Sequence, residues 1–226
     1  MKKQWVVLMA GVLVVCMVIL AQQVKKSKNW LIKAPTLVFA THPFRTGDLL
    51  LFHSQGDGTF AALTRFMTSC FINHVGMVYV HPATNHPFLL ESTFIGVRVA
   101  PLFAKLKSAK GKTFVRTLDP PLQPFQQTLI DEFVRVHWND AYMTNVLVHF
   151  SNRYNPLLRL PASKEHQEFT CCTLVASCLV HGKVLQAMSD TELEELNPKD
   201  FTSRANKLQW VHGYTYQPEQ MLTCPD

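Results

Sequence analysis

Two adjacent cysteines, Cys171 and Cys172, are the residues of this chain whose type and position most directly suggest chemistry. They lie within EFTCCTLVASCLVHG, which begins at Glu168, where polar residues give way to an apolar run of helical character. A cysteine in the first turn of a helix lies near the positive end of the helix dipole, which favours the thiolate and makes the sulfur a nucleophile near neutral pH. Thr170 is a candidate N-cap. A buried cysteine is more often only a small hydrophobic residue, so the pair alone does not establish a site.

A nucleophilic thiol needs a base, and His74 is the candidate because it opens NHVGMVYV, a mostly apolar segment that predicts a rigid strand. Glu91, which follows the apolar run of PFLLEST, is the candidate third group and would hold the imidazole in the useful tautomer. A thiol, an imidazole and a carboxylate together carry out acyl transfer. Each residue also has an ordinary structural role, and their spacing does not show that they meet in space.

Other chemistries lack their signatures. The sequence contains no G-x-S-x-G nucleophile elbow, no Walker loop, no H-E-x-x-H helix and no dinucleotide glycine fingerprint. Cys171, Cys172, Cys178 and His181 have the residue types of a zinc site, but adjacent side chains on a helix point about 100° apart and no C-x-x-C knuckle is present. We therefore expect neither a metal nor another cofactor.

The elements that must position these residues fall into a strand-rich half followed by a helix-rich half. Short apolar or alternating runs bounded by turn residues predict five strands. They cover residues 49–52 and the segments NHVGMVYV, PFLLEST, GVRVAPL and KTFVRTL. Helices are predicted from Pro124 through PFQQTLIDEFVRVHW and over the cysteine stretch, with Gly182 as a C-cap. These patterns predict an α+β fold with a small antiparallel sheet.

An apolar segment near the start, WVVLMAGVLVVCMVILA from Trp5 to Ala21, contains no charged residue and is about long enough to cross most of a bilayer's hydrocarbon. We predict a single-pass transmembrane helix that acts as a signal anchor, with the lipid bilayer as a partner. A cleaved signal peptide is the alternative, although no clear A-x-A site follows. Lysines on both flanks leave the orientation open. The predicted organisation is an anchor over residues 1–28, a tether over 29–45 and a catalytic domain over 46–226.

The charge of the chain is concentrated around this apolar segment. The 226 residues include 22 Lys and Arg against 16 Asp and Glu, which gives a net charge of +6. Six lysines and no acidic residue precede residue 34, which leaves 16 basic against 16 acidic residues in the remainder. Basic residues that flank an apolar span favour lipid headgroups, so we expect no nucleic-acid partner. The six cysteines lack the density of a disulfide scaffold and are expected to be mostly free thiols.

Four motifs occur in an order that points to a known family: GDLLLF, NHVGMVYV, LLEST followed by GV, and TCCTLVASCL. They resemble the permuted papain-like branch of the NlpC-type thiol hydrolases, above all its YiiX-like group, which includes poxviral members. Lecithin retinol acyltransferase is a more distant relative. The resemblance spans roughly residues 46 to 202 and includes ELNPKDF, similar to a proline-bearing segment that often follows the cysteine helix. It implies a permuted papain-like fold, with barrel strands first and the nucleophile's helix last.

The resemblance also implies roles for individual residues. The family's histidine stands in an H-V-G strand opening, here His74, and its third polar residue stands on the following strand, here Glu91. Its cysteine stands three residues before a Leu-Val or Phe-Val pair. With Leu174 and Val175 as that pair, Cys171 takes the nucleophile position and the next cysteine takes a place often held by serine. The helix pattern alone does not decide between the two cysteines, because each lies on an equally apolar stripe.

The implied activity is that of a membrane-anchored cysteine hydrolase or acyltransferase with a Cys-His-Glu triad. The bond would be an amide, an ester or a thioester, and the predicted anchor favours a lipid or another membrane-associated substrate. A fold shared this widely does not choose among peptidases, amidases and acyltransferases. The alternative is a catalytically inactive protein of the same fold that binds a partner or has a structural role at the membrane.

Overall fold

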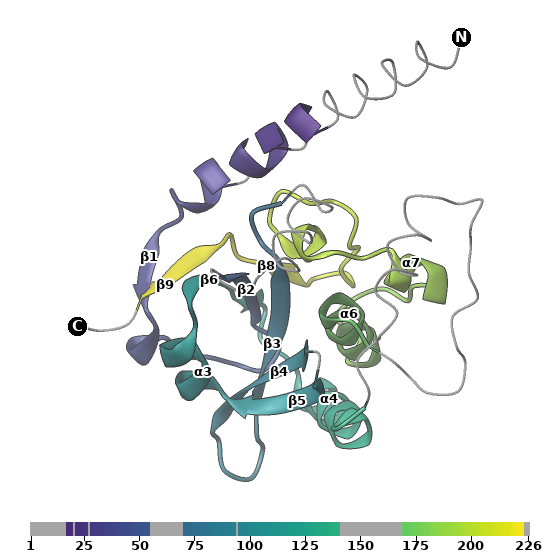
Figure 1. Cartoon of the computed structure of the whole chain (residues 1–226). Helices are drawn as coiled ribbons and strands as arrows, with labels where there is room; N and C mark the ends of the chain where they lie inside the picture. The colour runs from purple at the N-terminus through teal and green to yellow at the C-terminus, as the bar shows by residue number, and fades with distance from the viewer. Residues whose placement is uncertain are drawn as a thin grey trace.

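The computed structural model describes residues 17–19, 21–26, 28–54, 70–93, 95–140 and 169–223. Its fold is α+β and is built around one seven-stranded sheet (Figure 1). The strands of this sheet are β1 (Thr36–Val38), β2 (Leu49–Ser54), β3 (His74–Val80), β4 (Pro87–Thr93), β5 (Gly96–Pro101), β6 (Gly111–Arg116) and β9 (Gln220–Thr223). Their order across the sheet is β1-β9-β6-β2-β3-β4-β5. A separate two-stranded sheet pairs β7 (Leu118–Asp119) with β8 (Thr215–Tyr216).

The sheet is larger than the small antiparallel sheet predicted from the sequence. β2, β3, β4, β5 and β6 agree with the five predicted strands and pair antiparallel with their neighbours. β9 pairs antiparallel with β6, whereas β1 pairs parallel with β9, so residues 36–38 and 221–223 lie side by side. Residues 29–45 were expected to form a tether, but they contribute β1 to the sheet and the fully buried Leu31 to the core.

Helices cover both faces of the sheet. α4 (Pro124–His137) and α6 (Cys171–His181) lie on one side, and the short α3 (Leu102–Ser108) lies on the other (Figure 1). Short helical turns of the described residues include η1 (Phe39–Thr41), α7 (Asp190–Glu194) and η3 (Pro198–Phe201). α4 begins at Pro124, as predicted, since proline has the backbone angle of a first helical residue and needs no hydrogen-bond partner there.

The central strand β2 sends side chains into both layers. Leu49 and Leu51 join the larger core cluster, which also contains side chains of α4 and α6. Leu50 and Phe52 join a smaller cluster on the opposite face together with Leu102 of α3. Because both faces of the strand are buried, its sequence is a continuous apolar run rather than an alternating one.

α6 begins and ends where the sequence predicts. Thr170 is the N-cap: its hydroxyl accepts a hydrogen bond from the Thr173 N–H, and the Thr173 hydroxyl accepts one from the Thr170 N–H. At the other end, the N–H of Gly182 donates to the carbonyl of Cys178. Most of the helix is buried, as its apolar composition predicts, so the first turn is held firmly against the sheet.

Gly76 allows β3 and β4 to pack closely. A Cβ atom at this position would lie 2.6 Å from Cδ1 of Leu89 and 3.1 Å from the carbonyl oxygen of Leu90. Leu89 is fully buried, so its side chain has little room to move aside. The glycine of the H-V-G segment is therefore needed for packing beside the strand residues that carry the candidate site.

The N-terminal part of the chain differs from the prediction. Residues 17–19, 21–26 and 28–31 are helical, and the helical residues after position 21 include two glutamines and three lysines. Within the described part of the chain, none of the helices has both the length and the apolar character needed to span a bilayer. This finding contradicts the predicted transmembrane helix and the single-pass membrane localisation based on it. Residues 5–16 and 20 of the predicted segment lie outside the described residues.

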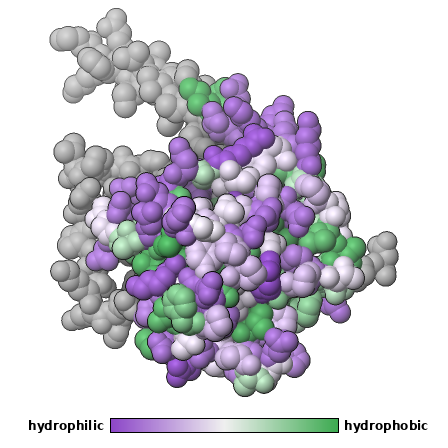
Figure 2. Space-filling model, turned by 180° about the vertical axis from the view of Figure 1, so that it is seen from behind, coloured by the Kyte–Doolittle hydropathy of each residue, from purple (hydrophilic) through white to green (hydrophobic). Residues whose placement is uncertain are grey.

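Exposed hydrophobic side chains do not gather into one broad surface on the face seen in Figure 2. Green groups there are separated by hydrophilic residues. The most exposed large apolar side chains of the described residues are Ile95, Val136, Phe125 and Trp138.

Candidate functional site

His74 and Glu91 contact each other from neighbouring strands. His74 is the first residue of β3, and Glu91 lies near the end of β4, which pairs antiparallel with β3. Nε2 of His74 is 3.0 Å from Oε2 of Glu91. Since an ionised carboxylate only accepts hydrogen bonds, Nε2 carries the proton and Nδ1 is the ring nitrogen that remains for another partner. The ring of His74 also packs against Phe52, which limits its rotation.

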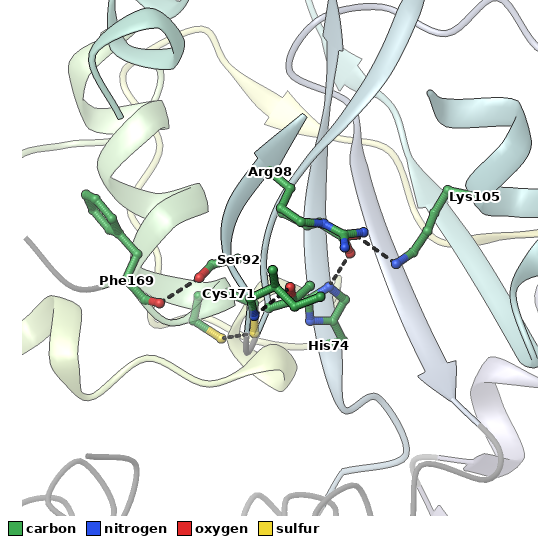
Figure 3. Close-up of polar contacts among 10 residues, drawn as sticks. His74, Ser92, Arg98, Lys105, Phe169 and Cys171 are labelled. Atoms are coloured by element: carbon green, nitrogen blue, oxygen red, sulfur yellow. Dashed lines mark hydrogen bonds and ion pairs between the residues drawn. The ribbon is translucent and has the colours of Figure 1, made fainter. Parts of the chain in front are cut away.

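The Glu91 carboxylate is fully buried and is held by two further basic groups. Nζ of Lys105 lies 2.7 Å from Oε1, and Nη2 of Arg98 lies 3.3 Å from the same oxygen. Arg98 is directly opposite Glu91 in the β4–β5 ladder, whereas Lys105 reaches the carboxylate from α3. Figure 3 shows the side chains of Arg98, Lys105 and His74 converging. A buried carboxylate needs such partners because burial takes it out of water.

Cys171 approaches this cluster from α6, on the side of the sheet opposite α3. It is the first residue of α6, which packs against β3, and it is only partly buried. The nearby His74 ring and the backbone N–H of Val75 both lower the pKa of its thiol. The sulfur of Cys172 lies 3.8 Å away. Several groups that favour a negative sulfur therefore surround Cys171.

A hydrogen bond ties the start of α6 to β4. Ser92 donates from its hydroxyl to the carbonyl oxygen of Phe169 at 2.7 Å, and both groups are buried (Figure 3). Ser92 follows Glu91 directly in β4. The segment that leads into Cys171 is therefore fixed to the strand that carries the carboxylate.

The charges of the cluster support one another. Burial lowers the pKa of His74, but its interactions with Cys171 and Glu91 outweigh burial and raise this pKa from 6.5 to about 9. The hydrogen bond from Cys172 lowers the pKa of the Cys171 thiol well below its ordinary value, and His74 lowers it further, against the opposing effect of burial. Burial raises the pKa of Glu91, but His74 and Lys105 outweigh it and lower this pKa to about 2. Near neutral pH these shifts favour a thiolate and an imidazolium beside a carboxylate.

The structure thus brings together all three of the predicted site residues, Cys171, His74 and Glu91. Sequence reasoning missed Arg98 and Lys105. A signal for Arg98 was present, because only two residues separate PFLLEST from GVRVAPL in the sequence, and a hairpin of that spacing pairs residue 91 with residue 98, as the β4–β5 register shows. No comparable signal existed for Lys105, whose helix α3 was not predicted.

The cluster does not fit a metal ion. Across the described ranges, no three or more His, Cys, Asp or Glu side chains are grouped as metal ligands. Glu91 is already held by three basic side chains, which would repel a cation. Burial raises the pKa of the Cys178 thiol, the reverse of what a metal-binding thiolate needs. Cys70, Cys171, Cys172 and Cys178 form no disulfide with one another, and the other two cysteines lie outside the described residues.

A cavity of about 440 Å³ lies apart from this cluster. It is lined by residues of the N-terminal helical segment, among them Lys26 and Trp30, and by residues around η3, among them Lys199 and Arg204. Arg204 stacks over the Trp30 ring at 4.8 Å from its centroid. Neither His74 nor any other member of the cluster lines this cavity.

Comparison with known proteins identifies a shared fold. No family model matches the chain, and no curated protein does. The structure is similar to the crystal structure of the metalloprotein yiiX from Escherichia coli O157:H7, with a TM-score of 0.50 and 16% sequence identity. The similarity covers 79% of this chain and 99% of that chain. The likeness to the YiiX-like group predicted from the motifs is therefore confirmed at the level of the fold.

Proposed function

We propose that this protein is a cysteine hydrolase or acyltransferase that acts on an amide, ester or thioester bond. Cys171 is the nucleophile, His74 the general base and acid, and Glu91 the group that orients His74. The observation that supports this most directly is the chain of contacts from the Cys171 sulfur through the His74 ring to the Glu91 carboxylate, with its 3.0 Å Nε2–Oε2 distance. A thiolate held beside an imidazolium is the activated form of a cysteine nucleophile.

In the first half of the reaction, the Cys171 thiolate attacks the carbonyl carbon and a pair of electrons moves onto the carbonyl oxygen. The first backbone N–H groups of α6, including that of Cys171, are suited to stabilise this oxygen because the helix dipole is positive there. The His74 imidazolium then gives its proton to the leaving nitrogen, oxygen or sulfur. The carbon–leaving-group bond breaks, and an acyl-cysteine remains.

In the second half, His74 is neutral and acts as a base. It takes a proton from water in hydrolysis, or from another acceptor in acyl transfer, and that oxygen or other nucleophile attacks the acyl-cysteine. The thiolate leaves, and the imidazolium is restored. Throughout both halves, Glu91 keeps the proton on Nε2 and so holds the other ring nitrogen available for the reacting groups.

The reactivity of Cys171 tests the proposal without a known substrate. The full chain is treated with limiting iodoacetamide across a range of pH, and labelled cysteines are identified by mass spectrometry. We expect one site that reacts faster than free cysteine at neutral pH, because only a thiolate is nucleophilic. This fast labelling should disappear in Cys171→Ala, slow in His74→Ala, and remain in Cys178→Ala, the matched control from the same helix.

Fast labelling that survives Cys171→Ala, or an intact Cys171 that reacts no faster than free cysteine, would contradict the proposal and favour an inactive binding or structural protein. A panel of aryl esters, amides and thioesters then identifies the bond. Turnover should decline as the pH rises through about 9, because His74 loses the proton that it must give to the leaving group.

A further inference from the structure

The two oxygens of the Glu91 carboxylate have different partners. Oε2 accepts the hydrogen bond from His74 at 3.0 Å, and Oε1 accepts bonds from Lys105 at 2.7 Å and Arg98 at 3.3 Å. Because the basic side chains occupy Oε1, rotation of the carboxylate is restricted and Oε2 stays directed at the His74 ring. Lys105 and Arg98 therefore orient the Glu91 carboxylate, and the carboxylate in turn orients the His74 ring.

The charges that face Glu91 among the described residues come from several elements. They are His74 of β3, Arg98 of β5 and Lys105 of α3, with the Cys171 thiolate of α6 on the far side of the His74 ring. A buried carboxylate whose partner was His74 alone would bind the ring's proton tightly, since few other groups would share its negative charge. The positive charges of Arg98 and Lys105 reduce how strongly Glu91 stabilises the proton on His74.

This arrangement bears directly on the reaction, because the imidazolium has to release a proton in the first half of the cycle. If Glu91 stabilises the imidazolium too strongly, His74 becomes a poor acid. Lys105 makes the shorter of the two additional contacts, and its side chain is less exposed than that of Arg98, at 29% against 37%. Lys105 is therefore the stronger candidate for an effect on His74.

We propose that Lys105, assisted by Arg98, is a positioning residue of this centre: it acts through Glu91, fixing the carboxylate and limiting how strongly that carboxylate holds the His74 proton. The inference rests on the proposed function. It adds α3, an element outside the strand and helix that carry the nucleophile and the base, to the parts of the fold that set the chemistry of the site.

The test is a titration of the His74 ring in the full chain, followed by NMR with labelled histidine. In Lys105→Met the midpoint should move upward from the wild-type value by about half a pH unit or more, because a positive charge near the ring is lost. Lys105→Arg should restore the wild-type midpoint, since it keeps both the charge and the hydrogen bond. Lys107→Met removes the same charge from an exposed position on α3 and should leave the midpoint unchanged.

A second variant tests whether the effect passes through Glu91. In a Glu91→Gln background, no carboxylate holds Lys105 beside the ring, so Lys105→Met should shift the His74 midpoint much less than it does in the wild type. An equal shift in both backgrounds would overturn the proposal. So would a downward shift, or one that Lys107→Met reproduces.

The two proposals fail in different ways. Loss of the proposed function shows as ordinary reactivity of Cys171 in the wild-type protein. Loss of the role of Lys105 shows as an unchanged His74 titration in Lys105→Met while Cys171 still labels rapidly. Thermal unfolding of each variant identifies any that is misfolded. If Lys105→Met is misfolded, the comparison of Lys105→Arg with the wild type still tests whether a positive charge at this position maintains the His74 midpoint.

Discussion

The Cys172 thiol lies 3.8 Å from the Cys171 sulfur and is almost completely buried. By the family resemblance, Cys172 takes a position next to Cys171 that is often held by serine. Serine and cysteine both donate a hydrogen bond from a short side chain. The contact therefore indicates that what this position supplies is a donor to the thiolate, in addition to packing.

Removing this donor should make the Cys171 thiolate harder to form. In Cys172→Ala we expect the pKa of Cys171 to rise toward its ordinary value, since a hydrogen bond to a charged group contributes about 1.5–3 kcal/mol. Cys172→Ser keeps a donor and should stay close to the wild type. The pH dependence of iodoacetamide labelling measures the shift, and an equal change in both variants would show that Cys172 acts only through packing.

Among the elements, β4 connects the two layers of the site. Successive strand residues point to opposite faces of a sheet. Glu91 accordingly meets Lys105 of α3, whereas the next residue, Ser92, bonds to the Phe169 carbonyl just before α6. One strand therefore positions both the Glu91 carboxylate and the start of the helix that carries Cys171.

Loss of the Ser92 hydroxyl should loosen this connection. Ser92→Ala leaves the buried carbonyl of Phe169 without this donor, which should lower the free energy of unfolding by about 1–3 kcal/mol. Cys171 should also label more slowly at every pH, with no change in the shape of the profile, because its position rather than its charge is affected. The neighbouring Thr93→Ala is the matched control, because the Thr93 hydroxyl accepts an exposed 3.4 Å hydrogen bond from the Ile95 N–H.

A Thr93→Ala effect as large as that of Ser92→Ala would count against this role for the hydroxyl. Urea unfolding measures the stability of both variants, and the iodoacetamide assay measures their reactivity. A shift of the pH profile in Ser92→Ala would likewise show that the bond acts on the charge of the site instead of its geometry.

The same elements show what the sequence can and cannot predict. β2 to β6 were predictable because apolar or alternating runs end at turn residues, and the caps of α6 were predictable from Thr170 and Gly182. α3 was missed because its seven residues directly follow β5 and are too few for a clear helical period. β1 and β9 were missed because their pairing joins distant parts of the chain, which no local pattern reports.

Prediction of the site depended on both local pattern and resemblance. The order of the motifs and their similarity to a known family singled out Cys171, His74 and Glu91. The spacing of these residues in the sequence alone gave no evidence that they meet in space. Arg98 followed from hairpin register, although only after the strands were paired. Lys105 required the position of α3 on the sheet, which is a property of packing.

For the molecule as a whole, Glu91 makes stability depend on pH. Its pKa in the folded protein is about 2, below the ordinary 4.5, so its ionised form stabilises the fold above pH 4.5 and this contribution is lost as the pH falls through about 2. Glu91→Gln lacks the contribution. We expect the variant to be less stable than the wild type by roughly 2–3 kcal/mol near pH 5, and this difference should shrink as the pH approaches 2.

Urea unfolding at a series of pH values measures this difference. A gap between wild type and Glu91→Gln that stays constant across the acid range would show that the lost stability comes from packing. At alkaline pH the sign is reversed for His74, whose raised pKa stabilises the fold below about 6.5 and ceases to do so as the pH rises through about 9.

β9 lies between β1 and β6 in the sheet but follows both of them in the chain. During synthesis the ribosome therefore releases β1 and β6 long before the strand that joins them. Until β9 emerges, β6 has an unpaired edge, and an open edge is a template on which another chain can add a strand. A nascent chain that stalls before residue 220 would carry the candidate site's strands and helices complete, yet would expose the open edge of β6.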